Sequence, residues 1–313
     1  MRLSKYLSTK RCGYAAAFAL SVFLFAGCSI QKMAVDQTAT VMGDGLVAFD
    51  SEEDMQFARE AFPASLKTME TFLVSSPENE TLLLLLARGY ASYSFAFVES
   101  EYEKAVVDGT EEEIEYHKAR ARKLYLRARG FGFRLLGNAE LQEAALGHDI
   151  PATEKALEGL GKDAGPGLFW TAYAWGSAVQ VGQDNPDLLA GLPIIERMMG
   201  RVLELGPEYY YSGAHLFFGV YYASRPPMFG GDPKKSKASF DVAMEKHGSQ
   251  NLLIPLMEGL FYAKQTQDRA LFDKRMQEVL NADLSEHPEL RLNNEIARAR
   301  ARFWLGQADE LFF

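Results

Sequence analysis

The stretch HLFFGVYYASRPPMFGGDPKKSKASF, residues 215–240, decides the fold that we expect for this chain. Its apolar helical pattern stops at Pro226-Pro227, turns through Gly230-Gly231 and starts again at Asp232-Pro233. Proline cannot continue a helix, glycine turns freely, and an aspartate before a first-turn proline caps the next helix. We therefore interpret the stretch as the elbow of a helical hairpin.

A phosphate-binding loop is the alternative that the two glycines and Lys234-Lys235 raise. The GxxxxGK[ST] pattern is absent, and no strand-like run precedes the glycines. Asp232 would also place a negative charge where a phosphate would bind. Helix capping explains the same residues without a ligand.

Helix start signals similar to Asp232-Pro233 recur along the chain. In most of them a polar side chain precedes a proline or an acidic first turn, and an apolar face with a 3.6-residue period follows. Alternating β-type runs joined by Asn-Gly turns are absent. The sequence therefore predicts an all-α chain with about ten to twelve helices. The signals begin at Ser51, Ser76, Thr110, Asn185, Asp232 and His287.

The hairpins follow the pattern of tetratricopeptide repeats, in which a small residue lets paired helices approach and an aromatic residue fills the gap to the next pair. Two copies of the pattern are clear, although the copy at the elbow is about five residues too long between its halves. The elbow copy consists of Phe218-Gly219, Tyr222, Ser236, Phe240 and Ala243. The other copy consists of Gly89-Tyr90, Ala121, Tyr125 and Ala128.

The N-terminus carries the pattern of an export signal. Lys5, Lys10 and Arg11 precede an apolar run over residues 14–25, which is too short to span a bilayer comfortably. Small residues then lead to Cys28, and this end resembles a bacterial lipoprotein signal, in which cleavage exposes a cysteine for lipidation. The alternative is a plain secretory signal with an accidental cysteine.

The predicted divisions are a signal peptide over residues 1–27, a lipidated tether with one short helix over 28–50, and a single all-α domain over 51–313. Lipidation of Cys28 would anchor the chain to a membrane from the periplasm. Ser29 rather than Asp follows the cysteine, which favours the outer membrane. Past residue 28 no apolar run in the sequence is long enough to span a membrane.

The charge balance argues against nucleic acid as a partner. The chain has 33 Lys and Arg against 42 Asp and Glu. A surface of this sign repels phosphates and anionic lipid head groups. The only two cysteines, Cys12 and Cys28, fall in the signal and at the lipidation site, so no disulfide or thiolate ligand is expected in the exported body.

The sequence carries no catalytic or metal-binding pattern. None of the five histidines has a partner at metal-ligand spacing, and a GxSxG motif is absent. Acidic runs such as residues 111–113 fall in first helical turns, where carboxylates complement the helix dipole. We therefore expect no enzyme, metal or cofactor. An envelope hydrolase would need two buried carboxylates about 5–10 Å apart across a cleft.

Aromatic side chains are the strongest candidates for binding. Neighbouring residues on a helix lie about 100° apart, so consecutive tyrosines cannot all face one core, and some must reach a partner, a groove or water. Arg225 either caps the end of its helix or offers its guanidinium to a ligand or partner. The candidate residues are Tyr209, Tyr210, Tyr211, Tyr221, Tyr222, Arg225, Phe229, Trp170 and Tyr173.

The segment AGLPIIERMMGRVLELGPEYYYSGAHLFFGVYYASRPPMFGGDPKKSKASFDVAM, residues 190–244, resembles the T-component of tripartite ATP-independent periplasmic (TRAP) transporters. The resemblance continues through residues 288–305 and back to residues 29–35. It implies tetratricopeptide-like hairpins behind a lipoprotein signal. It also implies docking of the transporter's periplasmic substrate-binding P-component by a homo-oligomer, with a trimer favoured, and a channel for a small apolar ligand.

The function that these observations favour is that of a non-enzymatic periplasmic lipoprotein that scaffolds TRAP-type solute uptake. The alternative is a tetratricopeptide lipoprotein that assembles the outer membrane or cell envelope. Neighbouring genes for a transporter permease would favour the first function, and neighbouring envelope-assembly genes would favour the second.

Overall fold

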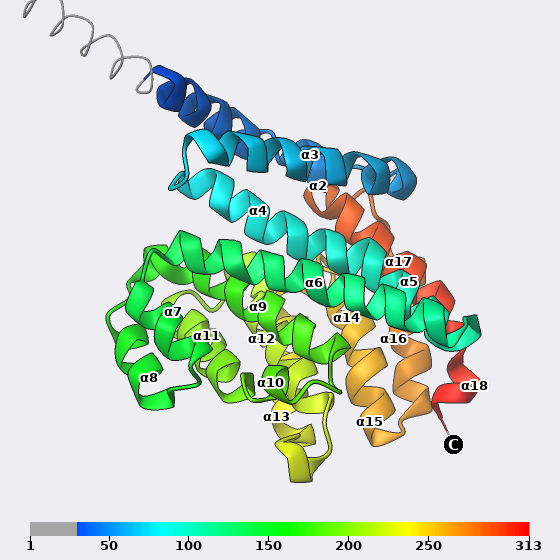
Figure 1. Ribbon diagram of the computed structural model, residues 1–313. Coiled ribbons are helices and arrows are strands. Elements are labelled where there is room, and N and C mark those ends of the chain that lie inside the picture. The colour runs from blue at the N-terminus through cyan, green and yellow to red at the C-terminus, as the bar shows by residue number, and fades with distance from the viewer. Residues whose placement is uncertain (1–29, 313) are drawn as a thin grey trace, which may run out of the picture.

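The computed structural model describes residues 30–312, so the expected signal segment and Cys28 lie outside the described residues. Figure 1 shows layers of helices beneath an N-terminal helix pair, and residues 30–312 contain no strand. The prediction of an all-α fold is confirmed. Whether the hairpins are true tetratricopeptide repeats stays a prediction.

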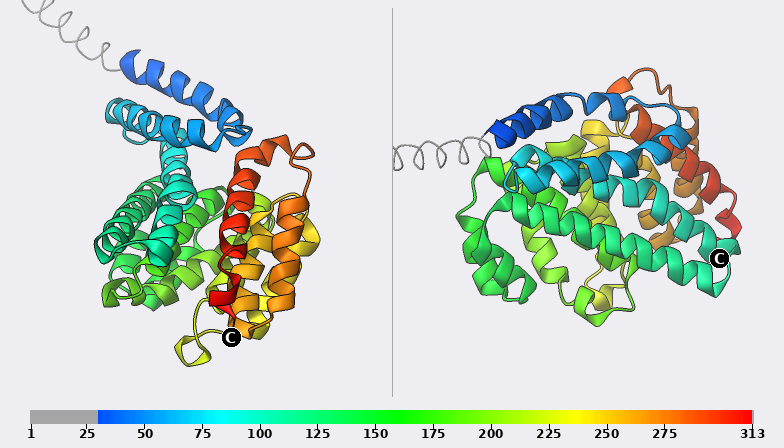
Figure 2. Two further views of the ribbon diagram at one scale, coloured as in Figure 1. Left: turned by 90° about the vertical axis from the view of Figure 1, so that its right-hand side faces the viewer. Right: turned by 45° about the horizontal axis from the view of Figure 1, so that its top comes forward.

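The first helices of the described chain, over residues 30–75, form an N-terminal layer that lies across one end of the body in every view (Figures 1 and 2). Val35 and Ala39 are buried in the main apolar core, so from residue 30 onward the expected tether is packed on the body. The burial of these apolar side chains stabilises a segment that we expected to form a tether with one short helix. The layer consists of a helix over residues 30–44, α2 (Val47–Asp50) and α3 (Met55–Ser75).

A single continuous helical stretch forms the centre of the molecule. It consists of α4 (Glu80–Tyr93), the π-helical segment η1 (Ser94–Glu99) and α5 (Ser100–Asp108). By length and composition the stretch Glu80–Asp108 could cross a membrane, although we expected no such run. Its most apolar window is 72% buried inside the protein, as in the core helix of a globular domain.

Two long helices pack against this stretch, α6 (Glu111–Leu136) and α9 (Gly165–Val181). Thr110 and Glu113 form the expected capping box at the start of α6. Gly132 lets α6 and α9 approach, because a Cβ atom there would lie 2.2 Å from the Thr171 hydroxyl oxygen. Ala121, Tyr125 and Ala128, expected on the inner face of a repeat, are fully buried.

Shorter helices cover one side of α9. Asn185 caps α10 through the backbone amides of Asp187 and Leu188, as its Asn-Pro signal predicted. The four helices are α7 (Ala139–Leu146), α8 (Ile150–Glu158), α10 (Pro186–Leu189) and α11 (Leu192–Leu205), with the 3-10 turn η2 (Lys162–Ala164) before α9.

The hairpin expected at residues 215–240 is formed by α12 (Tyr209–Ala223) and α13 (Pro233–His247), with the 3-10 turn η3 (Pro227–Phe229) between them. Asp232 accepts from the backbone amides of Lys234 and Lys235, so the capping interpretation is confirmed. Gly230 has φ 85°, a value that glycine adopts without strain.

The two helices of this hairpin meet at the residues that the repeat pattern singled out. A Cβ atom on Gly219 would lie 2.8 Å from the Phe240 ring. The Ser236 hydroxyl donates to the Gly219 carbonyl oxygen at 2.8 Å. Small residues therefore set the separation of α12 and α13.

The C-terminal part forms a second apolar core around Phe240 and Phe272, and Phe95 of η1 packs against both cores. Figure 2 shows these helices side by side beneath the N-terminal layer. They are α14 (Leu253–Met257), the π-helical η4 (Glu258–Ala263), α15 (Lys264–Thr266), α16 (Arg269–Asn281), the 3-10 turn η5 (Pro288–Leu290), α17 (Arg291–Leu305) and α18 (Ala308–Leu311).

Candidate ligand cavity

A cavity of about 860 Å³ lies between the two cores, with α4, η1 and α9 on one side and α12 on the other. This volume falls within the range of small-molecule pockets. The lining begins at Met42 and Leu46, near the N-terminal layer, and extends to Arg225 and Pro226 at the elbow.

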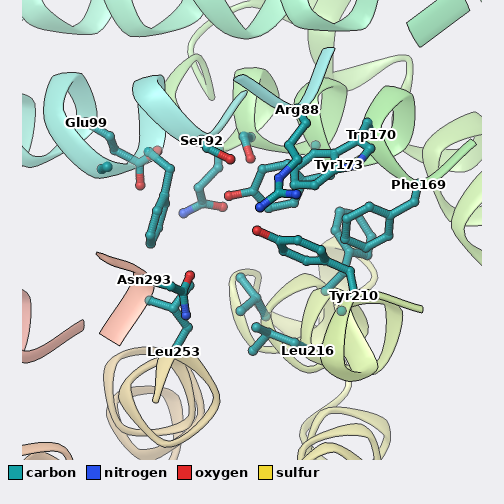
Figure 3. Close-up of a pocket in the computed structure, with 18 of the residues that line it drawn as sticks. Arg88, Ser92, Glu99, Phe169, Trp170, Tyr173, Tyr210, Leu216, Leu253 and Asn293 are labelled. Atoms are coloured by element: carbon teal, nitrogen blue, oxygen red, sulfur yellow. The ribbon is translucent and has the colours of Figure 1, made fainter. Parts of the chain in front are cut away.

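The cavity wall is mainly aromatic and aliphatic. Trp170 and Tyr210 have ring centroids 4.8 Å apart in an edge-on arrangement, and Phe169 lies 5.7 Å from Tyr210. Figure 3 shows Phe169, Trp170 and Tyr173 above Tyr210, with Leu216 and Leu253 below it. Such a wall favours an apolar ligand body, because aromatic and aliphatic surfaces gain free energy when water leaves them.

The start of α12 does not follow a right-handed helix. Tyr210, Tyr211 and Ser212 have φ values of 50°, 54° and 60°, in the left-handed region. This conformation costs about 1–2 kcal/mol per residue for side chains with a Cβ atom. The Ser212 hydroxyl is held 2.8 Å from His247 Nδ1, and Gly213 leaves room for the Phe169 ring.

The left-handed turn brings Tyr209 and Tyr210 to the same neighbours, Phe169 and Trp170, whereas Tyr211 lies against His247. The three consecutive tyrosines therefore do not all face one core, as we expected, and Tyr210 lines the cavity. Tyr209 packs 5.3 Å from Phe169, and its hydroxyl accepts from Trp170 Nε1 at 3.2 Å. Tyr209 and Tyr210 are both half-buried inside this chain.

An ion pair borders the aromatic wall. Arg88 of α4 donates to Asp50 at 2.5 Å, and its guanidinium lies over the Tyr210 ring, 5.3 Å from the centroid. Burial raises the pKa of Asp50, although Arg88 opposes this shift. Burial likewise raises the pKa of Tyr210, so its hydroxyl remains protonated at neutral pH. Figure 3 shows the Arg88 head group and the Tyr210 hydroxyl pointing toward each other.

A second buried polar cluster lies at the opposite side of the cavity. Arg300 of α17 binds both Glu99 and Glu103, and it donates to the Phe95 carbonyl oxygen at 3.3 Å. Glu99 also accepts from the Tyr125 hydroxyl. Burial raises the pKa of Glu103 to about 7, against the effect of Arg300. This cluster joins the C-terminal helices to η1.

The two glutamates do not form the acid pair that a hydrolase would need. Glu99 lines the cavity, whereas Glu103 does not, and both lie on one helical stretch and bind the same arginine. Among residues 30–312, no group of three or more His, Cys, Asp and Glu side chains is arranged to hold a metal ion.

The structure brings some of the sequence candidates to the cavity and leaves others outside its lining. Trp170, Tyr173, Tyr210, Tyr221 and Arg225 line it. Three further candidates do not line it, Tyr209, Tyr211 and Tyr222, and the Phe229 side chain lies outside the part of the chain that the structure describes.

The tyrosines outside the lining have other neighbours. Tyr211 lies edge-on to His247, with centroids 5.9 Å apart. The Tyr222 hydroxyl donates to Glu196 at 2.8 Å. Tyr211 and Tyr222 remain half-buried rather than fully covered.

Sequence reasoning missed Arg88, Glu99, Asn251 and Asn293, which supply polar groups to the lining. Arg88 follows a run of five leucines, and this single charge inside an apolar stretch was the available signal. The other three give no local signal, because only tertiary packing brings them to the cavity.

Comparison with known proteins agrees with the resemblance seen in the sequence. A protein of Treponema pallidum (strain Nichols) described as "Uncharacterized protein" is 25% identical over 339 aligned residues, covering 99% of each chain. A model of the family described as "TRAP transporter T-component" matches residues 51–312, most of the chain. The chain therefore belongs to the TRAP transporter T-component family.

Proposed function

We propose that this protein is a non-enzymatic accessory component of a TRAP solute-uptake system, docks the periplasmic substrate-binding P-component and holds or passes a small apolar ligand. The family match over residues 51–312 supports the link to a TRAP transporter. The ligand part of the proposal is carried by one observation, the 860 Å³ cavity with its mainly aromatic and aliphatic lining.

The extent of the lining supports passage rather than storage alone. Lining residues run from Leu46, near the N-terminal layer, to Pro226, an exposed residue at the elbow. A ligand delivered at one end by a docked protein could therefore reach the other end without leaving the apolar wall. Movement along such a path needs only small shifts of side chains such as Tyr210 and Leu216.

The proposed site of action is the periplasm, where lipidation at Cys28 anchors the chain, with the outer membrane favoured. The helix over residues 30–44 packs on the body, and it begins two residues after Cys28 in the sequence. A homo-oligomer, with a trimer favoured, would present several cavities to P-components at once. The half-buried Tyr211 and Tyr222 are candidates for these contacts.

Cross-linking in intact cells followed by purification tests the docking proposal. We expect peptides of a TRAP solute-binding protein to be recovered with this chain and to be absent when Cys28 is replaced by a residue that blocks anchoring. Recovery of envelope-assembly proteins instead, with no solute-binding protein under gentle conditions, would contradict the proposal and favour the alternative role.

A further inference from the structure

Not every charged side chain in the cavity lining has a partner of opposite charge. Four charged residues line it: Asp50, Arg88, Glu99 and Arg225. Asp50 and Arg88 neutralise each other at 2.5 Å, and Glu99 lies against Arg300 at 3.5 Å. Among residues 30–312, no carboxylate lies within ion-pair distance of Arg225. The lining therefore has one charge without a counter-ion, and it is positive.

The acidic cluster on the opposite side does not supply the missing negative charge. Glu99 and Glu103 share Arg300, and the pKa of Glu103 is raised to about 7, so part of this cluster is protonated at neutral pH. The Tyr125 hydroxyl also occupies a Glu99 oxygen. These charges pair with one another on α17, η1 and α5, away from the elbow that carries Arg225, although Arg300 Nε, like Arg225 Nε, is buried without a hydrogen-bond partner.

The Arg225 guanidinium is held in position but is not satisfied. Its carbon lies 3.8 Å from the centroid of the Tyr221 ring, and one terminal nitrogen donates to the Tyr221 carbonyl oxygen at 3.0 Å. Arg225 thus caps the end of its helix, one of the two roles that we considered for it, and it also lines the cavity, whereas a contact with a ligand or partner stays a prediction. Its Nε atom is buried and has no hydrogen-bond partner, which is a costly state for a charged donor.

The elbow fixes the backbone of Arg225 as well. Gln265 donates to the Arg225 carbonyl oxygen at 2.9 Å. Gly231 packs so closely that a Cβ atom there would lie 1.8 Å from the same oxygen. Pro226, which follows, is exposed and also lines the cavity, so the guanidinium lies near one mouth.

Apolar side chains extend from Arg225 into the cavity. Val220, Leu216 and Phe217 continue along α12, and Leu253 faces them from α14. A ligand at this place would meet one fixed cation at the mouth and a mainly apolar face of α12 over the following turns.

We propose that the cavity binds an amphiphile with a single anionic head, a carboxylate or a phosphate, placed on the Arg225 guanidinium with its hydrocarbon chain along α12. This inference rests on the proposed function, since it assumes that the cavity is a ligand site. A charged head would supply the counter-ion that the Arg225 guanidinium lacks, and the chain would displace water from the aromatic wall.

Calorimetric titration of the purified full-length mature protein tests the head-group preference. The probes share a twelve-carbon chain and differ in the head: dodecanoate, dodecyl phosphate, dodecanol and dodecyltrimethylammonium, each below its micelle concentration. We expect one or both anionic probes to bind about tenfold to hundredfold more tightly than dodecanol. The tighter of the two anions identifies the head as carboxylate or phosphate.

Two variants separate a ligand contact from a structural role. Arg225→Gln should lose this anion preference and keep the affinity for dodecanol, which also shows that the cavity is intact. Arg225→Glu should reverse the preference toward dodecyltrimethylammonium. Lys246→Gln is the control, because Lys246 pairs with Glu208 and does not line the cavity.

Equal binding of all four probes, or unchanged dodecanoate affinity in Arg225→Gln, would overturn the inference. Loss of dodecanol binding in both Arg225 variants would also overturn it, since Arg225 would then only hold the elbow together. None of these results depends on capture of a P-component, so failure here is distinguishable from failure of the docking proposal.

Discussion

At the residue scale, close helix contacts depend on single glycines. Gly219 faces Phe240, with only 2.8 Å available for a Cβ atom. Replacing Gly219 with Ala should force α12 and α13 apart or displace the ring, at a cost of about 1–3 kcal/mol. Urea unfolding of the purified protein measures this difference.

Gly200 in α11 provides the matched control, because a Cβ atom there has nothing within 4 Å. Gly200→Ala should stabilise the protein by about 0.5–1 kcal/mol through helix propensity alone. Equal effects of the two substitutions would show that α12 and α13 are not packed as described.

The pKa of Glu103 predicts a pH dependence of stability. Its value is raised from 4.5 to about 7, so between these values the folded state keeps a proton that the unfolded state releases. The stability contribution is complete below pH 4.5 and is lost as pH rises through about 7.

The variant Glu103→Gln isolates this contribution. Relative to the wild type, it should gain stability as pH rises from about 5 to 7.5, by no more than about 3 kcal/mol. Thermal unfolding of the two proteins across this pH range measures their difference in stability. The other carboxylates contribute equally to both proteins, so their effect cancels in this difference. Parallel stability curves for the two proteins would contradict the burial of Glu103 beside Arg300.

The residue features that the sequence predicted are the local ones. Asp232, Thr110 and Asn185 cap helices as expected, because a cap depends on side chains and amides within three residues. The left-handed turn at Tyr210 was not predictable, because non-glycine residues adopt it only when distant partners such as Phe169 and His247 hold it.

At the element scale, the hairpin at the elbow was predictable from its prolines, its glycines and the spacing of its apolar residues. The continuity of α4, η1 and α5 did not, because a π-helical segment differs from an α-helix by one residue per turn and leaves no compositional mark. We expected residues 28–50 to form a tether with one short helix because they are mostly small and polar and include Gly43 and Gly45. In the helix over residues 30–44 only Val35 and Ala39 are buried, which is too weak an apolar pattern to predict packing.

Asp36 holds that N-terminal helix in place. It accepts from Lys32, Ser76 and Asn79, and the hydrogen bond from Lys32 is the largest cause that lowers the pKa of Asp36 to about 2. Asp36→Ala should release the helix, with faster amide exchange over residues 30–44 and little change in the global unfolding temperature.

Amide exchange measured by mass spectrometry checks this prediction, with Asp44→Ala as control. No hydrogen bond or ion pair is described for the Asp44 side chain, so exchange over residues 30–44 should stay slow in that variant. Equal exchange in Asp36→Ala and the wild type would mean that apolar burial alone holds the helix.

At the scale of the whole molecule, the cavity could not have been found from sequence. Its lining combines residues as distant as Arg88, Tyr210 and Asn293, and no local pattern reports that packing. The sequence indicated a binding role only through the excess of aromatic residues near 169–175 and 209–222 and through the family resemblance, which implied a channel for a small apolar ligand.

Leu216→Trp should fill part of the cavity, since this side chain faces its interior (Figure 3). We expect loss of any small molecule that co-purifies with the protein, while capture of a P-component continues. Val74→Trp adds the same bulk at a residue that is 80% exposed and should change neither property. Retention of the ligand by Leu216→Trp would place the ligand site elsewhere.

Native mass spectrometry of the gently purified, lipid-anchored protein tests the central claim most directly. The account predicts a complex whose mass equals copies of this chain plus a TRAP solute-binding protein, and which releases a small amphiphilic molecule on activation. A homogeneous species that contains this chain alone, with neither a solute-binding protein nor a bound small molecule, would contradict it.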